Sequence, residues 1–217
     1  MKYKLMIFDL DGTILATLDD LRNSVNYALR TLGYPTRTHE EVRAFVGNGM
    51  LNLIKRSAPN GATDDEIENI LKVFKAHYAE HKTDCTKPYT GIDKILKKLK
   101  DEGAILTVLS NKDDDAVGVL CEEYFPNTFH YTAGNRPDRK KKPNPESVHA
   151  IINKYGLTAS DTVYIGDSEV DVLTAQNANV DCVAVSWGFR DKEVLVEAGA
   201  KKIADNMTEL YECLIKQ

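Results

Sequence analysis

The spacing of apolar and polar positions changes along the chain and predicts two kinds of segment. Residues 5–8 form a short apolar run that is typical of a buried strand. From Leu18 to Leu32, apolar residues recur every three or four positions, as in an amphipathic helix, until Gly33 ends the pattern. The chain is therefore expected to begin with a buried strand that leads into a helix.

The helical spacing continues as far as residue 81. Three more helices are expected, over Glu40–Val46, Met50–Ser57 and Asp64–His81, with glycine-containing breaks at 47–49 and 59–61. Nothing in this part of the chain predicts a strand.

From Pro88 onward, strands and helices are expected to alternate, which is typical of a parallel sheet covered by helices. The expected strands lie at 105–110, 128–133, 162–165, 182–185 and near Ile203, and the expected helices at 92–101, 116–124, 145–155, 170–178, 193–198 and 207–215. The first strand belongs with this set. We therefore expect an α/β core with a doubly wound, mostly parallel sheet at 1–14 and 86–217, interrupted by an α-helical insertion at 15–85.

Composition narrows the class of protein. The chain has 217 residues, 42% of them hydrophobic, which is enough to bury a core. It shows no membrane-spanning run or secretory signal, so we expect a cytoplasmic protein with no membrane partner. Its four cysteines have no paired spacing, so we expect their thiols to be reduced. The net charge of −5 and the shortness of the basic run Arg139–Lys142 argue against a nucleic-acid partner. The sequence leaves the oligomeric state open.

Two carboxylates follow the first strand directly. Asp9 and Asp11 are two positions apart, so they point the same way from an extended chain, toward the edge of the sheet where ligands collect. Two like charges this close favour either a raised pKa or a bound hard cation such as Mg²⁺. The alternative is a pair of solvated turn aspartates that cap the next helix.

The end of the strand at 105–110 and a later loop bring further polar groups to the same edge. Ser110 and Asn111 could donate hydrogen bonds to an anion, or could simply cap the following helix. Lys142 precedes a stretch stiffened by two prolines and could neutralise phosphate charge, whereas Lys140 and Lys141 are expected to be solvated.

The strand at 162–165 delivers the last pair of acidic groups. Asp167 follows it directly and Asp171 lies one helical turn later, where helix capping is again an alternative. Competing signatures are missing from the sequence: there is no Walker-type phosphate loop, dinucleotide fingerprint, nucleophile elbow or spaced histidine pair for zinc.

These motifs, in this order, resemble the four motifs of the haloacid dehalogenase superfamily. The matching segments are Asp9–Thr13, Ser110–Asn111, Lys142–Pro145 and Gly166–Asp171. The helical insertion resembles the α-helical cap of that superfamily. Three further segments are similar to its phosphoglycolate phosphatase branch: Val46–Gly49, Pro88–Gly91 and Ser186–Gly188.

The resemblance implies a role for each motif residue. Asp9 would be the nucleophile that forms an aspartyl-phosphate, and Asp11 the general acid and then the base. Mg²⁺ would be held by the Asp9 carboxylate, the Asp11 carbonyl and the Asp167 carboxylate, while Asp171 would orient the lysine or the waters of the metal. The groups expected to bind the phosphoryl oxygens are Gly12, Thr13, Ser110, Asn111 and Lys142.

The resemblance therefore implies a Mg²⁺-dependent phosphatase of a small phosphorylated metabolite, with 2-phosphoglycolate as the first substrate to test. Pyrophosphatase, sugar-phosphate or nucleotide phosphatase and phosphomutase activities remain alternatives. Asp11 disfavours dehalogenation, because the dehalogenases of the superfamily lack an acid at this position. Ala16 departs from the branch, which often has an aspartate there. The cap residues that could contact substrate, although such residues are more often solvated, are Arg43, Asn48, Lys55 and Arg56.

Two readings from other classes remain. A phospho-aspartate signalling module also gathers acidic residues, a hydroxyl and a lysine at the strand ends of a doubly wound sheet, but such modules carry no helical lid after the first strand. A binding protein that has lost turnover would keep the pocket, yet this chain retains Asp9, Asp11, Lys142 and Asp167.

Overall fold

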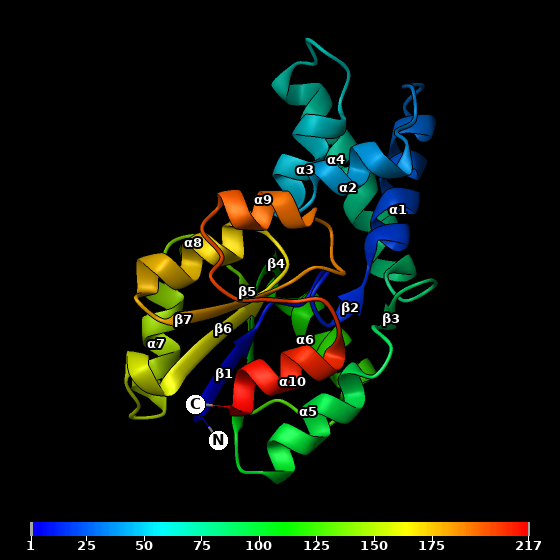
Figure 1. Ribbon diagram of the computed structural model, residues 1–217. Helices are drawn as coiled ribbons and strands as arrows, with labels where there is room; N and C mark the ends of the chain where they lie inside the picture. Colours follow the sequence, from blue (N-terminus) through cyan, green and yellow to red (C-terminus); the bar gives the residue numbers. More distant parts are fainter. Residues whose placement is uncertain (1, 217) are drawn as a thin grey trace.

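A six-stranded parallel sheet forms the centre of the computed structural model, which describes residues 2–216 (Figure 1). The strand order is β5-β4-β1-β6-β7-β8. The strands are β1 (Leu5–Phe8), β4 (Ile105–Asp113), β5 (Tyr131–Asn135), β6 (Thr162–Gly166), β7 (Asp181–Val185) and β8 (Ile203–Ala204). Every residue of β1 is buried, as a strand in the middle of a covered parallel sheet requires.

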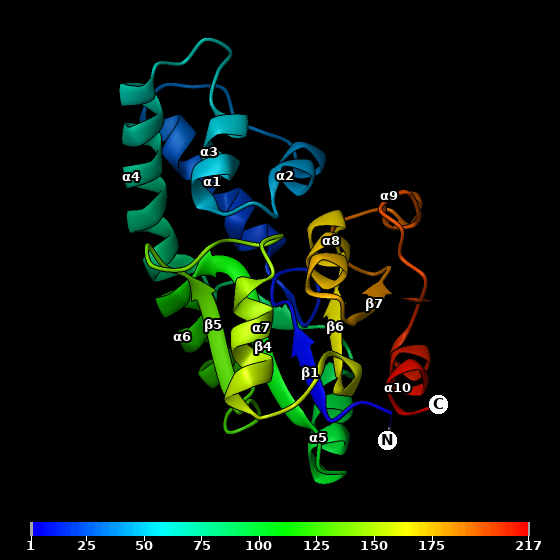
Figure 2. The same ribbon diagram turned by 90° about the vertical axis from the view of Figure 1, so that its left-hand side faces the viewer.

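Helices cover both faces of this sheet (Figure 2). Met6 and Phe8 of β1 pack on the same side as α5 (Ile92–Asp101), α6 (Asp114–Tyr124) and α10 (Met207–Ile215). The alternate residues Leu5 and Ile7 face α7 (Glu146–Lys154) and α8 (Glu169–Ala178). A short 3₁₀ helix at Ala159–Asp161 precedes β6, and α9 (Lys192–Glu197) packs beside α8. The predicted doubly wound α/β core is confirmed.

Four helices form a separate layer above the carboxyl ends of the strands (Figure 1). They are α1 (Leu18–Thr31), α2 (His39–Phe45), α3 (Met50–Ser57) and α4 (Asp64–His81). Val25, Ile54 and Phe74 lie in their shared apolar cluster, into which Phe189 of the core also packs. Within residues 2–216, no helix is long and apolar enough to cross a membrane.

The link between the core and these helices differs from the sequence prediction. Leu15–Ala16 forms a short strand, β2, that pairs antiparallel with β3 (Lys87–Pro88). Strands of two residues are too short to produce a recognisable alternation, so we expected only helices here. Asp20 of α1 accepts hydrogen bonds from the backbone N–H groups of Cys85 (2.9 Å) and Thr86 (2.8 Å), which fixes the two connections side by side. The domain boundaries placed at 14/15 and 85/86 fall beside this link and stay a prediction.

Strands β4 and β5, at one edge of the sheet, end later in the sequence than predicted. β4 continues to Asp113 instead of ending at Ser110, because a register shift after Leu109 lets Asp113 pair with Asn135. β5 correspondingly begins at Tyr131, three residues later than expected. The other predicted elements agree with the structure to within two residues at each end. Ser110 and Asn111, expected at the end of this strand, therefore lie within it.

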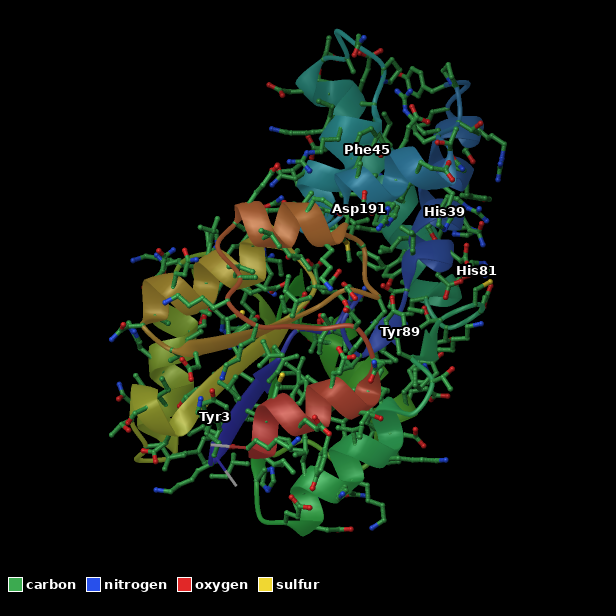
Figure 3. All side chains as sticks on the ribbon, viewed as in Figure 1. Tyr3, His39, Phe45, His81, Tyr89 and Asp191 are labelled. Atoms are coloured by element: carbon green, nitrogen blue, oxygen red, sulfur yellow. The ribbon has the colours of Figure 1, made fainter. Side chains whose placement is uncertain are left out.

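We call the layer formed by helices α1–α4 the cap, and one arginine of the core holds it above the sheet. The buried guanidinium of Arg190 donates to the carbonyl oxygens of Arg43 (3.0 Å) and Val46 (2.7 Å) and pairs with Glu169 (2.8 Å). Its neighbour Asp191, which Figure 3 places at the boundary between α9 and the cap, forms an ion pair with the Arg43 side chain at 2.9 Å. These contacts hold the cap against the edge where the candidate residues gather.

Candidate active site

A small cavity lies between the carboxyl ends of the strands and the cap. Its volume is about 50 Å³. The core contributes the polar wall, made of Asp9, Asp11, Ser110, Asn111, Lys112 and Asp167. The cap contributes a largely apolar wall, made of Leu21, Val46, Gly47, Gly49, Met50 and Leu53. The structure therefore brings residues from three predicted motifs into one enclosed space.

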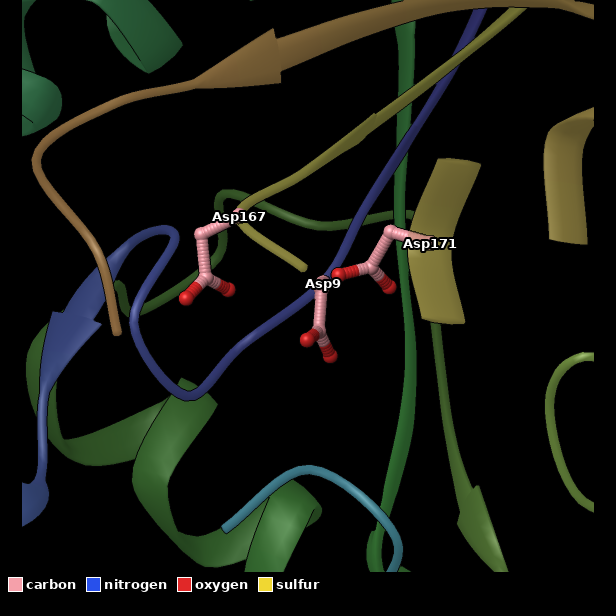
Figure 4. Close-up of side chains that lie close together, drawn as sticks. All are labelled: Asp9, Asp167 and Asp171. Atoms are coloured by element: carbon pink, nitrogen blue, oxygen red, sulfur yellow. The ribbon is translucent and has the colours of Figure 1, made fainter. Parts of the chain in front are cut away.

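Three carboxylates lie close together (Figure 4), and two of them, Asp9 and Asp167, line this cavity. Asp9 follows β1, Asp167 follows β6 and Asp171 lies in the first turn of α8, and each offers an oxygen within 4.8 Å of the others. All three are buried, which suits a hard divalent cation with oxygen ligands. Asp171 supplies the third carboxylate of this cluster. The Asp11 carbonyl, which the resemblance implies as a metal ligand, is a backbone group and stays a prediction.

Burial of Asp9 and Asp167 disfavours the charged forms of these two carboxyl groups. It raises the pKa of Asp9 to about 7, with the charges of Asp171 and Asp11 adding to the effect and Lys142 opposing it. The pKa of Asp167 is raised for the same reason, with Asp171 and Asp9 adding to the effect. A bound divalent cation would offset this cost, so the donor set fits the implied metal.

We expect the chelated protein to lose stability through Asp9 as the pH rises. The raised pKa means that the folded state holds this proton more tightly than the unfolded state does, so the stabilisation is full below about pH 4 and is lost toward pH 7. Relative to an Asp9→Asn variant, the wild type should lose about 2–3 kcal/mol of unfolding free energy between pH 5 and pH 8 in EDTA. Urea denaturation measures this difference. If the difference in unfolding free energy between the wild type and Asp9→Asn did not change with pH, the raised pKa of Asp9 would be contradicted.

Lys142 carries the only positive charge in direct contact with the described acidic cluster. Its buried ammonium lies 2.7 Å from Asp171 Oδ1 and 2.9 Å from Asp9 Oδ1. The contact with Asp9 is an ion pair without a well-aligned hydrogen bond, which leaves that oxygen without a hydrogen-bond partner among residues 2–216. Asp171 also accepts hydrogen bonds from the N–H and hydroxyl of Ser168, so it caps α8 while it binds the lysine.

Asn111 positions the loop that carries Lys142. Its Oδ1 accepts the Lys142 N–H at 2.9 Å, and its Nδ2 lies 3.2 Å from both the Lys142 carbonyl and the Gly47 carbonyl of the cap. The side chain that we expected to bind substrate is thus engaged with protein groups, while Ser110 lines the cavity.

Two glycines and a threonine surround the carboxylate of Asp167. Its carboxylate accepts hydrogen bonds from Thr13 Oγ1 (3.0 Å) and from the Phe189 N–H (2.7 Å). A Cβ atom on Gly12, where φ is +85°, would lie 2.3 Å from Asp167 Oδ2, and one on Gly188 would lie 2.3 Å from its Cβ. Both positions therefore need glycine to leave room for this carboxylate. Thr13, expected to bind substrate, supports the acidic cluster.

Comparison with known proteins agrees with this geometry. Residues 6–185 match the sequence profile of the haloacid dehalogenase-like hydrolases. The chain belongs to this family. Curated phosphoglycolate phosphatases are similar to the hydrolase over most of its length. The enzyme of Pseudomonas savastanoi pv. phaseolicola is 33% identical and covers 95% of this chain and 78% of its own, and that of Vibrio parahaemolyticus is 30% identical and covers 96% and 95%.

Solved structures place the hydrolase in the same group. A candidate phosphoglycolate phosphatase from Lactobacillus delbrueckii subsp. bulgaricus superposes with a TM-score of 0.94, at 36% identity and with full coverage of both chains. A predicted phosphoglycolate phosphatase from Haemophilus somnus gives a TM-score of 0.92 at 26% identity, with 98% of each chain covered. The resemblance to the phosphoglycolate phosphatase branch is therefore confirmed.

The sequence prediction missed Lys112, a buried lysine of this hydrolase that contacts Asp11. Its ammonium lies 2.9 Å and 3.2 Å from the two Asp11 oxygens and 2.6 Å from the hydroxyl of Tyr78 in α4. Lys112 directly follows the predicted site residues Ser110 and Asn111 in the same strand, and this adjacency was the signal that could have found it. No sequence pattern points to Tyr78, which reaches the site only through the packing of the cap.

The cap residues proposed for substrate contact lie outside the cavity lining. Arg43 pairs with Asp191, and Arg56 donates to the Phe45 carbonyl at 3.3 Å. Lys55 is exposed, and the Asn48 carbonyl accepts from Asn52 at 3.0 Å. The cap wall of the cavity instead consists of apolar side chains and glycines.

Proposed function

We propose that this hydrolase is a Mg²⁺-dependent phosphatase that cleaves a small phosphomonoester through an aspartyl-phosphate, with 2-phosphoglycolate as the first-choice substrate. The observation that carries the proposal is the meeting of the Asp9, Asp167 and Asp171 carboxylates with Lys142, directly beside the cavity that Asp9 and Asp167 line. Such a site can accept a dianionic phosphoryl group only together with a cation. The phosphoglycolate phosphatases among the relatives support the choice of substrate.

Asp9 and Asp11 divide the chemistry between them. A carboxylate oxygen of Asp9 attacks phosphorus, and the phosphorus–oxygen bond to the leaving group breaks while Asp11 gives that oxygen a proton. In the second half, Asp11 takes a proton from the water that attacks the aspartyl-phosphate, which releases inorganic phosphate and regenerates Asp9. Ser110 and Lys142 stabilise the phosphoryl oxygens during both transfers.

The Asp9 and Asp167 carboxylates, with the Asp11 carbonyl, would hold Mg²⁺, and Asp171 lies close enough to join them or to orient Lys142. When bound, the ion supplies positive charge beside the phosphoryl oxygens and offsets the repulsion among the acidic groups.

The cavity favours a small leaving group. Its volume is about 50 Å³, and its cap wall is apolar. The two cationic side chains of the lining, Lys112 and Arg190, are already paired with Asp11 and Glu169. On size, phosphoglycolate and pyrophosphate suit this space better than the bulkier sugar phosphates or nucleoside monophosphates, whereas the described lining leaves no unpaired cation for the negative charge of either leaving group.

Phosphate release from a panel of phosphorylated metabolites tests the proposal. We expect phosphoglycolate to be the best substrate and chelation by EDTA to lower its turnover by about 100-fold or more, with recovery on adding Mg²⁺. Better turnover of pyrophosphate or a sugar phosphate would replace the substrate but keep the chemistry. A stable phosphorylated Asp9 without phosphate release would instead support the signalling alternative.

A further inference from the structure

Lys112 and Tyr78 connect the cap to Asp11. Lys112 comes from β4 of the core and Tyr78 from α4 of the cap, and both side chains are almost fully buried. A lysine ammonium has three hydrogen-bond donors. Here, its contacts are the two oxygens of Asp11, at 2.9 and 3.2 Å, and the hydroxyl of Tyr78, at 2.6 Å. The ammonium also lies 4.8 Å from the centre of the Tyr78 ring, a favourable cation–π distance.

The position of this ammonium fixes the position of the Asp11 carboxylate. Within residues 2–216, all side-chain hydrogen bonds to the two Asp11 oxygens come from Lys112. A buried ammonium that lacks acceptors is costly, so Lys112 cannot readily leave its two partners. Tyr78 fills the one donor that Asp11 does not use, and it can do so only while α4 lies against the core.

We propose that Lys112 and Tyr78 are positioning residues that hold the Asp11 side chain beside the leaving group, and that Tyr78 makes this placement depend on the seated cap. Lys112 donates to both Asp11 oxygens in the carboxylate form and to one of them when the other carries the proton that the leaving group receives. The inference rests on the proposed function, because it explains how Asp11 is placed for that reaction. Neither residue contacts the phosphoryl group in this scheme.

The leaving group distinguishes positioning from a merely structural role. The value of kcat/KM includes the steps up to departure of the leaving group, when its bond to phosphorus breaks and its oxygen keeps the electron pair. An alkyl phosphate such as phosphoglycolate releases a strongly basic alkoxide that needs the proton of Asp11. The p-nitrophenolate ion released from p-nitrophenyl phosphate is weakly basic and needs almost no such help. Misplacing Asp11 should therefore lower kcat/KM for the alkyl phosphate more than for p-nitrophenyl phosphate.

The experiment measures kcat/KM for p-nitrophenyl phosphate and for the best alkyl phosphate of the panel, with Mg²⁺ present. The ratio of the alkyl to the aryl value should fall by about tenfold in Lys112→Met and by about threefold in Tyr78→Phe. It should fall furthest in the reference variant Asp11→Asn, and Lys112→Arg, which keeps the charge and its donors, should recover part of the loss. Lys140→Met and Tyr27→Phe change exposed residues of the same types and should keep the wild-type ratio.

A wild-type ratio in both Tyr78→Phe and Lys112→Met, whatever the loss in absolute rate, would overturn the positioning role. If Lys112→Met does not fold, the decision passes to Tyr78→Phe, which removes a single oxygen atom. Failure of the proposed function looks different: the wild type would then release no more phosphate than Asp9→Asn from either substrate.

Discussion

Replacing Asp9 with asparagine should lower phosphate release by roughly 10⁴-fold or more, because the amide cannot serve as the nucleophile. The two side chains have nearly the same volume, and the substitution removes a buried charge, so we expect the fold to persist. Phosphate release in Mg²⁺ measures the loss, and circular dichroism checks the fold.

Asp138→Asn is the matched control for this variant. Asp138 lies in an exposed loop, where it pairs with Arg136 at 3.1 Å. The control should retain wild-type turnover. If Asp9→Asn also retained substantial turnover, the aspartyl-phosphate mechanism would be wrong, and a directly attacking water would have to replace it.

Replacing Lys142 with methionine should destabilise the protein by about 3–5 kcal/mol and remove its activity. The substitution leaves the Asp9 and Asp171 carboxylates buried and facing each other without their shared cation. Urea denaturation in EDTA at pH 8 measures the loss. The penalty should shrink at pH 5, because the raised pKa of Asp9 allows that carboxyl to take up a proton and become neutral.

Lys140→Met provides the matched comparison in the same loop. Lys140 is exposed and pairs with Glu146 at 3.0 Å. Exposed pairs contribute little, so its removal should cost less than about 1 kcal/mol. Equal losses in the two lysine variants would mean that Lys142 does not balance the acidic cluster.

The site residues that directly follow parallel strands could be predicted from the sequence, because such strands end at the same edge of a sheet. Asp9 and Asp167 each follow a buried apolar run, and adjacent parallel strands bring their carboxyl ends to one edge. Local sequence therefore predicted their convergence, even though 157 positions separate them. Lys142 was found for a related reason, since the prolines after it restrict the path of its loop.

The remaining features depend on packing that no local pattern encodes. Tyr78 has the same helical spacing as any apolar residue of α4, and its contact with Lys112 exists only because the cap lies on the core. Thr13 and Asn111 lie where they were predicted and bind protein groups there, while their contact with substrate stays a prediction. A hydroxyl or an amide at a strand end can hold a ligand or another protein group, and only the three-dimensional structure distinguishes the two.

Burial of Phe189 makes the contact between the cap and the core depend on temperature. This aromatic ring belongs to the core, yet it is buried within the apolar cluster of the cap. Lifting the cap would expose the ring to water, and exposure of apolar surface brings a positive change in heat capacity. Because hydrophobic association weakens on cooling, the cap is held down less firmly in the cold than at moderate temperatures.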